Sequence, residues 1–362
     1  MKLHGGDIYG ISEKTGIDPT EWLDFSANIN PLGIPDGVMK AMVDSLSQTA
    51  LHYPDPDCRQ LVSALGQYHG IPEDEILCGN GAADLIYRLV YALKPQKALV
   101  LAPTFMEYQE ALAQVGTEVV IHHLDDTFYL TESILDDMAE SIDMMFLCNP
   151  NNPTGLLIDQ NLLHKVLMKA QKCGILVVLD ESFVDFVENS QCVSMVKLLD
   201  TFPNLLILRS FTKFYAIPGI RLGYAMSSDR ELLRKIKLAG QTWPVSSVAV
   251  AAGVAALHET EFQKLTIEYV AEARMELRDG LKKLGFRVLD GQADYLMFQV
   301  PYHQTDDEDL YEKLLQEQMI IRRCSNFVGL DETFYRVAVK KKEENQRLLE
   351  ILEKILHEEK KA

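Results

Sequence analysis

Short runs of apolar residues recur along the chain, and longer stretches with helical patterns separate them. Four such runs lack the alternation of a half-buried strand: Ala98–Leu101, Met144–Leu147, Ile175–Leu179 and Leu205–Leu208. Strands that are apolar on both faces are typical of parallel sheets covered by helices. We therefore predict an α/β fold with a mostly parallel sheet. Ligands of such sheets gather beyond the carboxyl ends of the strands, so the residues after these runs are candidates for one shared site.

The pattern changes near Asp229, where long helical stretches begin and strand patterns become sparse. The later strand patterns cover Phe286–Leu289, Asp294–Val300, Met319–Arg322 and Phe334–Val339. A chain of 362 residues is also too long for one ordinary core. We predict an N-terminal arm over residues 1–45 packed on a small domain, a large domain over 46–228, and a linking helix with a small α+β domain over 229–362.

Charge and composition narrow the possible partners. A formal net charge of −18 repels phosphate backbones, so we expect no nucleic-acid partner. No apolar run approaches the roughly 20 residues of a membrane span, and the N-terminus does not read as a signal peptide. The six cysteines show no C-x-x-C spacing and read as reduced thiols. We expect a cytoplasmic protein without a membrane partner.

The stretch that follows Leu205–Leu208 carries the first candidate for chemistry. It begins Arg209-Ser210-Phe211-Thr212-Lys213 and continues to Arg221. A lysine just past a buried strand can form an imine with a cofactor, while nearby hydroxyls and an arginine bind its phosphate. A surface-loop lysine with a structural arginine explains the same residues equally well.

Three further segments could bind the same cofactor as that lysine. Asp180 ends a buried run and needs a cationic partner, such as a pyridinium nitrogen, an arginine or a helix N-terminus. Asn152 lies in a rigid Asn-Pro turn after another run; many such turns are only turns. The segment Gly79–Asp84 precedes a helical pattern, whose first N–H groups can bind phosphate. The P-loop and dinucleotide fingerprints are absent.

Taken in this order, the four segments resemble the aminotransferase fold of pyridoxal 5'-phosphate (PLP) enzymes, also called fold type I. The resemblance covers the whole chain. It implies that Lys213 is the Schiff-base lysine, that Asp180 partners the pyridine nitrogen and that Asn152 donates to the ring oxygen. It implies a stacked ring at Phe105. The implied phosphate ligands are Ala82, Ala83, Ser210, Thr212 and Arg221.

Tyr53 matches a tyrosine that, in this fold, reaches the cofactor phosphate of the neighbouring subunit. The resemblance therefore implies a homodimer with shared active sites. A turn aromatic packed within its own chain is the alternative.

Within the fold, the chain most resembles the threonine-phosphate decarboxylases of cobalamin synthesis, which are relatives of histidinol-phosphate aminotransferases. Four stretches carry this resemblance: His4-Gly5-Gly6, Leu23–Gly33, Thr212–Gly219 and Ile321–Cys324. It implies a small phosphorylated amino acid as substrate. Its implied contacts are His4, Gly5, Asn28, Asn152, Arg322 and Arg336. A substrate with a carboxylate and a phosphate suits two arginines, because each can bind an anion with two hydrogen bonds.

Some features leave alternatives open. Phe183 stands where histidinol-phosphate aminotransferases usually have a tyrosine that helps Asn152, which favours the decarboxylases. An aminotransferase acting on histidinol phosphate or a related amine remains the main alternative, and a non-catalytic PLP-binding regulator is a second. Arg323 is either a helper of Arg322 or a solvated neighbour. His122-His123 with Asp125-Asp126 superficially suggests a metal site, but in a predicted strand and turn these residues are expected to be solvated, and we expect no metal site.

Overall fold

The computed structural model describes residues 5–301 and 309–359 of the chain. Its centre is a seven-stranded sheet in which six strands are parallel and β8 is antiparallel to both of its neighbours. This mostly parallel sheet confirms the predicted α/β class. The strand order is β2 (Ile76–Gly79), β8 (Gly223–Met226), β7 (Leu205–Ser210), β6 (Leu176–Asp180), β5 (Met144–Cys148), β3 (Lys97–Ala102) and β4 (Glu118–His123).

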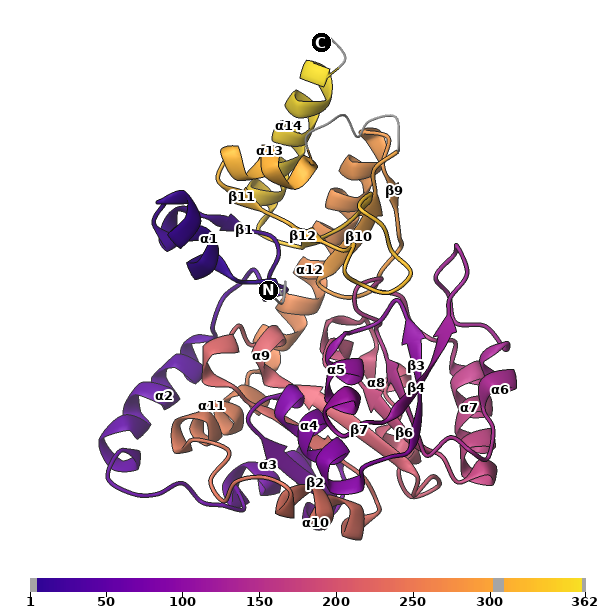
Figure 1. The fold of residues 1–362 in the computed structure, drawn as a ribbon. Coiled ribbons are helices and arrows are strands. Elements are labelled where there is room, and N and C mark those ends of the chain that lie inside the picture. The colour runs from indigo at the N-terminus through magenta and orange to yellow at the C-terminus, as the bar shows by residue number, and fades with distance from the viewer. Residues whose placement is uncertain (1–4, 302–308, 360–362) are drawn as a thin grey trace.

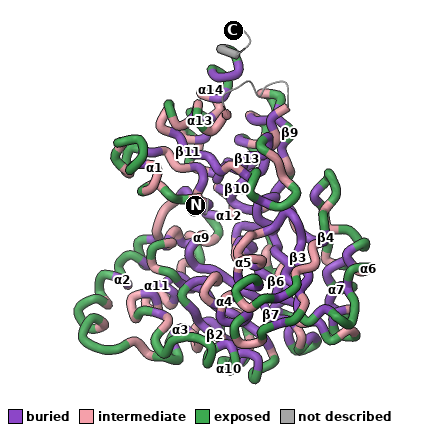
Figure 2. Tube along the Cα trace, in the orientation of Figure 1, coloured by how far each residue is buried: buried purple, intermediate pink, exposed green. Residues whose placement is uncertain are grey.

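Helices cover both faces of this sheet, as its doubly apolar strands require (Figure 1). One face packs against α4 (Ala82–Leu93), α5 (Glu107–Gln114) and α10 (Arg230–Leu238). The other packs against α3 (Arg59–His69), α7 (Gln160–Cys173) and α11 (Ser247–Leu257), with the short α6 (Ile134–Asp137) and α8 (Ser190–Val193) nearby. Figure 2 shows the strands buried between these layers.

The C-terminal part of the chain forms a second, antiparallel sheet. Its order is β12 (Arg322–Arg323), β13 (Phe334–Ala338), β10 (Tyr295–Gln299) and β9 (Arg287–Val288). The helices of this part are α12 (Thr260–Lys283), α13 (Leu310–Gln316) and α14 (Lys342–Glu359). Among the described residues, no helix is both long enough and apolar enough to cross a bilayer.

The predicted strand over Met319–Arg322 divides into two strands in different sheets. Its first half is β11 (Met319–Ile320), which pairs in parallel with β1 (Leu23–Asp24) from the N-terminal part of the chain. Its second half continues as β12, beside β13. The sequence does not show this division, because no turn residue separates the apolar Met319, Ile320 and Ile321 from Arg322.

The N-terminal part of the chain contacts two different parts of the molecule. Helix α1 (Ile8–Thr15) and β1 lie beside the C-terminal sheet, whereas α2 (Asp36–Thr49) packs against α11 (Figure 1). The domain boundaries given above remain predictions.

Candidate active site

A cavity of about 580 Å³ lies where the N-terminal residues, the large sheet and the C-terminal sheet meet. Nearly all of the predicted site residues line it. They are Gly5, Asn28, Ala82, Ala83, Phe105, Asn152, Asp180, Ser210, Thr212, Lys213, Arg221, Arg322 and Arg336. Tyr53 does not line the cavity, and His4 lies outside the described residues.

Asp180, the last residue of β6, points to the sheet face that α4 and α5 cover, because side chains alternate along a strand. One of its carboxylate oxygens accepts a hydrogen bond from the Tyr108 hydroxyl at 2.7 Å, and the other accepts from the Ser182 backbone N–H at 2.9 Å. Burial raises the pKa of Asp180, and these hydrogen bonds counteract that shift. The carboxylate is thus held in place, with cavity space beside it for a cationic group.

The Asn-Pro turn after β5 is held by its buried asparagine, Asn151. The Asn151 side chain accepts from the Thr104 hydroxyl at 2.7 Å and donates to the Pro103 carbonyl at 3.0 Å, while its backbone carbonyl accepts from the Tyr295 hydroxyl at 2.9 Å. The next residue, Asn152, accepts through Oδ1 from Arg336 Nη1 at 2.5 Å. Its Nδ2 therefore remains available to donate to a group in the cavity.

Potential hydrogen-bond donors gather around the start of α4 and form a cradle there. The helix has Gly81 as its N-cap and no side-chain capping bond, so its first N–H groups lack that partner. A Cβ on Gly81 would stand 2.7 Å from Arg221 Nη2, so only glycine lets this guanidinium approach the helix start. The hydroxyls of Ser210 and Thr212, 2.7 Å apart, complete the cradle at the end of β7. The arrangement suits a dianion.

Lys213 lies beside this cradle in α9 (Phe211–Phe214) and lines the same cavity. Burial is the main cause that lowers the pKa of its ammonium group, and the charges of Arg221 and Arg336 act in the same direction. A lysine with a lowered pKa is neutral more often and is a better nucleophile.

Arg322 and Arg336 face one another on neighbouring strands of the C-terminal sheet. They are directly paired residues of the antiparallel strands β12 and β13, so their side chains leave the same face of that sheet. Both are buried, and neither forms an ion pair with a carboxylate within the described part of the chain. Burial and the charge of Arg336 lower the pKa of Arg322 to about 10. Two uncompensated guanidiniums in one cavity indicate an anionic ligand.

The N-terminal segment closes one side of this cavity. Arg336 Nη2 donates to the Ser26 carbonyl at 2.9 Å. Gly5 lies directly against that residue, since a Cβ on Gly5 would stand 2.1 Å from the Ser26 carbonyl oxygen and 3.4 Å from Arg336 Nη2. Position 5 therefore requires glycine for this approach.

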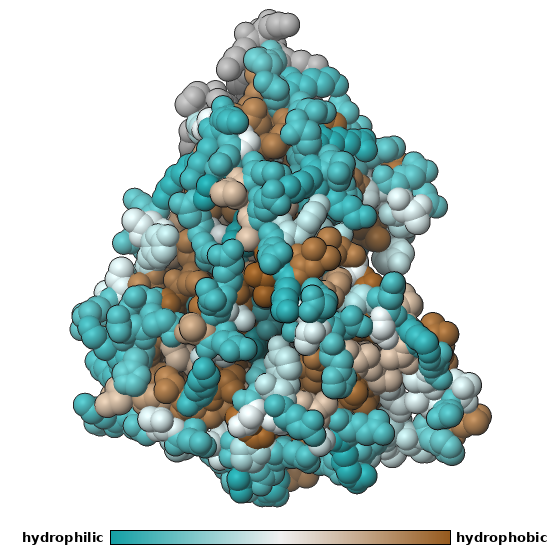
Figure 3. Space-filling model, turned by 180° about the vertical axis from the view of Figure 1, so that it is seen from behind, coloured by the Kyte–Doolittle hydropathy of each residue, from teal (hydrophilic) through white to brown (hydrophobic). Residues whose placement is uncertain are grey.

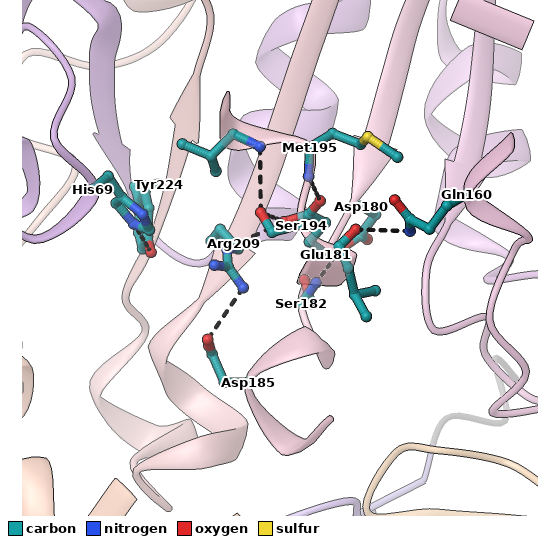
Figure 4. Close-up of polar contacts among 12 residues, drawn as sticks. His69, Gln160, Asp180, Glu181, Ser182, Asp185, Ser194, Met195, Arg209 and Tyr224 are labelled. Atoms are coloured by element: carbon teal, nitrogen blue, oxygen red, sulfur yellow. Dashed lines mark hydrogen bonds and ion pairs between the residues drawn. The ribbon is translucent and has the colours of Figure 1, made fainter. Parts of the chain in front are cut away.

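A buried ion network fixes the strand ends from the opposite face of the sheet (Figure 4). Arg209 of β7 pairs with Glu181 at 3.5 Å and with Asp185 at 3.1 Å. Glu181 also accepts from the Ser194 hydroxyl and the Met195 N–H, at 2.7 and 2.9 Å. Because Glu181 and Arg209 directly adjoin Asp180 and Ser210, this network holds the positions of both.

Comparison with known families agrees with this arrangement. The family model for aminotransferase class I and II matches residues 20–352. The chain belongs to this family. The match confirms the predicted fold, and with it PLP as the cofactor of the family.

Relatives within the aminotransferase family include both reaction types considered above. A threonine-phosphate decarboxylase of Salmonella typhimurium is 38% identical over 98% of this chain and 96% of its own. The structure of L-threonine-O-3-phosphate decarboxylase from Porphyromonas gingivalis has a TM-score of 0.81 at 26% identity, covering 92% of this chain and 99% of that one. A histidinol-phosphate aminotransferase structure from Clostridium acetobutylicum has a TM-score of 0.86 at 30% identity, covering 92% and 99%.

The residues present fit the cofactor of this family. Its three polar regions require a phosphate site, a carboxylate for the ring nitrogen and an amine for the carbonyl carbon. The cradle at α4, the fixed carboxylate of Asp180 and the amine of Lys213 provide these three, and all of them open into one cavity.

Three other residues considered in the sequence analysis lie outside the cavity. Tyr53 is 79% exposed and stacks on Trp243, with ring centroids 4.5 Å apart. Arg323 points away from the cavity and pairs with Asp309 and Glu312. His122 Nδ1 donates a hydrogen bond to the Asp137 carboxylate at 2.5 Å, and no cluster of metal-ligating residues occurs among the described residues.

Sequence reasoning did not identify two residues that the fold brings to this site: Tyr108 and Ser26. Tyr108 follows Phe105 by three positions, at the start of α5. This spacing places the two aromatic side chains on one side of the helix start, so the sequence could have marked Tyr108 as a site residue. Ser26 acts through its backbone carbonyl, so no local sequence signal marked it.

Proposed function

We propose that this protein is a PLP-dependent decarboxylase of O-phospho-L-threonine that forms (R)-1-amino-2-propanol phosphate for the nucleotide loop of cobalamin. One observation carries the proposal: the buried, facing pair Arg322 and Arg336 lines the same cavity as Lys213. A substrate with two anionic groups neutralises both charges. The relative that is 38% identical is a threonine-phosphate decarboxylase.

Each arginine would take one anionic group. Arg336 is fixed through Asn152 and the Ser26 carbonyl, at the end of the cavity near Lys213, and would bind the substrate carboxylate. Arg322 is held by the Asn326 side chain at 2.9 Å and lies over the Phe327 ring, and would bind the substrate phosphate. Gly5 and Asn28, together with His4, would complete the substrate contacts.

The chain's own residues would hold the cofactor and control protons. When bound, the cofactor supplies an electron sink for the pair of electrons left at Cα as CO2 departs. Asp180 would keep the ring nitrogen protonated, and Asn152 would donate to the ring oxygen. Ala82, Ala83, Ser210, Thr212 and Arg221 would hold its phosphate, with Phe105 beside the ring. Lys213, or a water, would deliver the proton to Cα.

Which bond breaks at Cα depends on orientation, because only the bond perpendicular to the cofactor ring overlaps its π system. Binding the substrate at two points fixes that orientation more fully than one point does. The arginine pair therefore provides the means of directing the carboxylate, rather than the hydrogen, to the perpendicular position.

Transamination of histidinol phosphate is the second candidate, favoured by the 30% identical aminotransferase structure. Phe183 argues against it. This buried ring packs edge-on against Tyr295, with centroids 5.0 Å apart, and provides no hydroxyl beside Asn152.

The deciding experiment uses O-phospho-L-threonine labelled at the carboxyl carbon. We expect one CO2 for each substrate consumed and no glutamate when 2-oxoglutarate is present. Unphosphorylated threonine should have a lower kcat as well as a higher KM, because the phosphate contact helps to orient Cα. Glutamate formed from histidinol phosphate, with no CO2 from O-phospho-threonine, would establish the aminotransferase instead.

We further propose that the protein works in the cytoplasm as a homodimer. Apolar side chains that the single chain leaves exposed support a dimer: Met39, Val43, Leu46, Leu51, Tyr53 and Trp243. Three of them lie on α2, on the lower right of the molecule seen from behind in Figure 3, where hydrophobic atoms reach the surface. Exposed apolar side chains at this density are typical of a protein interface. Tyr53 would reach the partner's cofactor phosphate from there.

A further inference from the structure

A carboxylate lies in the first turn of the helix whose start forms the cradle. Helix α4 begins after its N-cap Gly81, and Asp84 is the acidic residue of its first turn. Asp84 Oδ2 accepts a hydrogen bond from the Asn80 backbone N–H at 2.9 Å. This contact holds the turn before α4, in which the Gly81 N–H donates to the Gly79 carbonyl at 2.8 Å. Asp84 therefore helps to fix the shape of the cradle.

The charge of Asp84 is unfavourable at this position. A helix N-terminus attracts an anion through its free N–H groups and its dipole. A carboxylate in the same turn interacts with that dipole itself and repels a phosphate dianion. Arg221 is the arginine of the cradle, and an uncompensated Asp84 would offset its attraction for the phosphate. A phosphate site that contains this carboxylate therefore needs a further cation.

Arg88 provides that cation from the next turn of α4. Its Nε donates to Asp84 Oδ1 at 2.9 Å and its Nη2 lies 2.7 Å from Oδ2, so the ion pair is bidentate. The Arg88 side chain is 5% exposed and that of Asp84 is 26% exposed. Gly240, just beyond α10, covers the guanidinium, since a Cβ on Gly240 would stand 2.3 Å from Arg88 Nε. A pair from which water is largely excluded is screened less than an ion pair on the surface.

We propose that Arg88 is a positioning residue that neutralises Asp84, so that this carboxylate holds the turn before α4 without repelling the cofactor phosphate. Arg88 does not line the cavity and acts through Asp84. The inference rests on the proposed function in one respect, namely that the cradle at α4 binds the phosphate of PLP. Loss of Arg88 should therefore weaken the binding of PLP but not that of pyridoxal, which lacks the phosphate.

The test compares the Kd of PLP with that of pyridoxal, each measured at neutral pH by titrating the apoenzyme and following the visible absorbance. In Arg88→Met, the uncompensated carboxylate should raise the Kd of PLP by about tenfold or more and change that of pyridoxal by less than about two-fold. Adding Asp84→Asn should restore PLP binding, because the amide oxygen still accepts from the Asn80 N–H but carries no charge. Arg234→Met is the control, because Arg234 pairs with Glu231 on the surface and should leave both constants unchanged.

Equal losses for PLP and pyridoxal in Arg88→Met would overturn the inference, because they would indicate a general distortion of the site. A double variant that binds PLP no better than Arg88→Met would overturn it as well. If Arg88→Met does not fold, Arg88→Lys takes its place. This variant keeps the charge without the bidentate geometry and should retain the wild-type ratio of the two constants, and loss of that ratio would overturn the inference. Failure of the proposed function is seen in the wild-type protein instead, as absent CO2 release or as equal affinity for PLP and pyridoxal.

Discussion

Arg322 and Arg323 are consecutive in the chain but have opposite surroundings. Arg322 lines the cavity without a carboxylate partner among the described residues, whereas Arg323 forms ion pairs with Asp309 and Glu312 and covers the Tyr311 ring. Alternation along β12 explains this difference, because successive side chains leave opposite faces of a sheet. Sequence alone left the role of Arg323 open for this reason: the direction of each side chain depends on which strand pairs with β12.

The first prediction concerns Arg322→Ala. Removing a buried, charge-assisted contact typically costs about 2 to 5 kcal/mol, so kcat/KM for O-phospho-threonine should fall on the order of 30-fold or more. Arg322→Lys should recover part of the loss, since an ammonium cannot donate two parallel hydrogen bonds. Steady-state assays of CO2 release measure both.

Arg323→Ala serves as the matched control, with an expected change of at most a few-fold. Equal losses in Arg322→Ala and Arg323→Ala would contradict the assignment of Arg322 to the substrate phosphate. So would an equal loss toward unphosphorylated threonine.

Site residues that belong to a sequence motif could be predicted. Site residues that act through tertiary contacts could not. Lys213, Asp180 and Asn152 each lie at the end of a buried strand or just beyond it, so sequence predicted that they meet. Ser26 acts through its backbone carbonyl and carries no motif. Its contact with Arg336 depends on how the N-terminal segment meets the C-terminal sheet, which no local pattern encodes.

At the scale of the elements, the ends of β6 and β7 are locked together behind the site. The ion pair between Glu181 and Arg209 is almost completely buried, with side-chain exposures of 0% and 6%. A buried pair of this kind adds little net stability over apolar residues, but each member depends on the other. The pair therefore serves to fix the two strand ends relative to each other.

Arg209→Met tests this interdependence. The variant leaves Glu181 buried without its cation, so the free energy of unfolding should fall by about 3 to 5 kcal/mol in urea titrations. Arg234→Met is the control: this arginine is 60% exposed in its ion pair with Glu231, which is 54% exposed, and its loss should have little effect on the free energy of unfolding. A similar loss in both variants would show that the buried network does not fix the strand ends.

The element scale also shows where strand prediction was insufficient. The run Met319–Arg322 was predicted as one strand, yet β11 pairs with β1 and β12 pairs with β13. Hydrophobicity indicates that a segment is a strand but does not specify its partners. Pairing between β1 and β11 joins segments nearly 300 residues apart, and only the complete fold brings them together.

At the scale of the whole molecule, Tyr53 belongs to the group of exposed apolar side chains that we propose as the dimer interface. Its ring lies outside the cavity of its own chain and stacks on Trp243 at the surface. A two-fold dimer uses the same patch on both subunits, so a residue that reaches the partner's site does so twice. Each site would then need Lys213 from one subunit and Tyr53 from the other.

Mixing two defective variants tests the shared site. Tyr53→Ala and Lys213→Ala homodimers should each have little activity, while a mixed dimer has one site with both native residues. With random exchange, activity should return to about a quarter of the wild-type level. Mixing Tyr53→Ala with the double variant Tyr53→Ala/Lys213→Ala is the control and should give no recovery. Absence of recovery in the first mixture, with subunit exchange verified by native mass spectrometry, would mean that each site is built from one chain.

In the proposed function, the facing register of Arg322 and Arg336 would also limit the spacing between the two anionic groups of the substrate. Directly opposed residues in an antiparallel pair have Cβ atoms about 4.5 to 5.5 Å apart, and backbone hydrogen bonds fix that separation. The backbone therefore fixes the spacing of the two arginines. A ligand fits when the distance between its two anionic groups matches that spacing. One extra methylene moves the far anion by up to about 1.5 Å, enough to lose one contact or misplace the reacting carbon. The protein would discriminate among phosphorylated amino acids by the number of bonds between their charges, and a methyl branch within that span would matter much less.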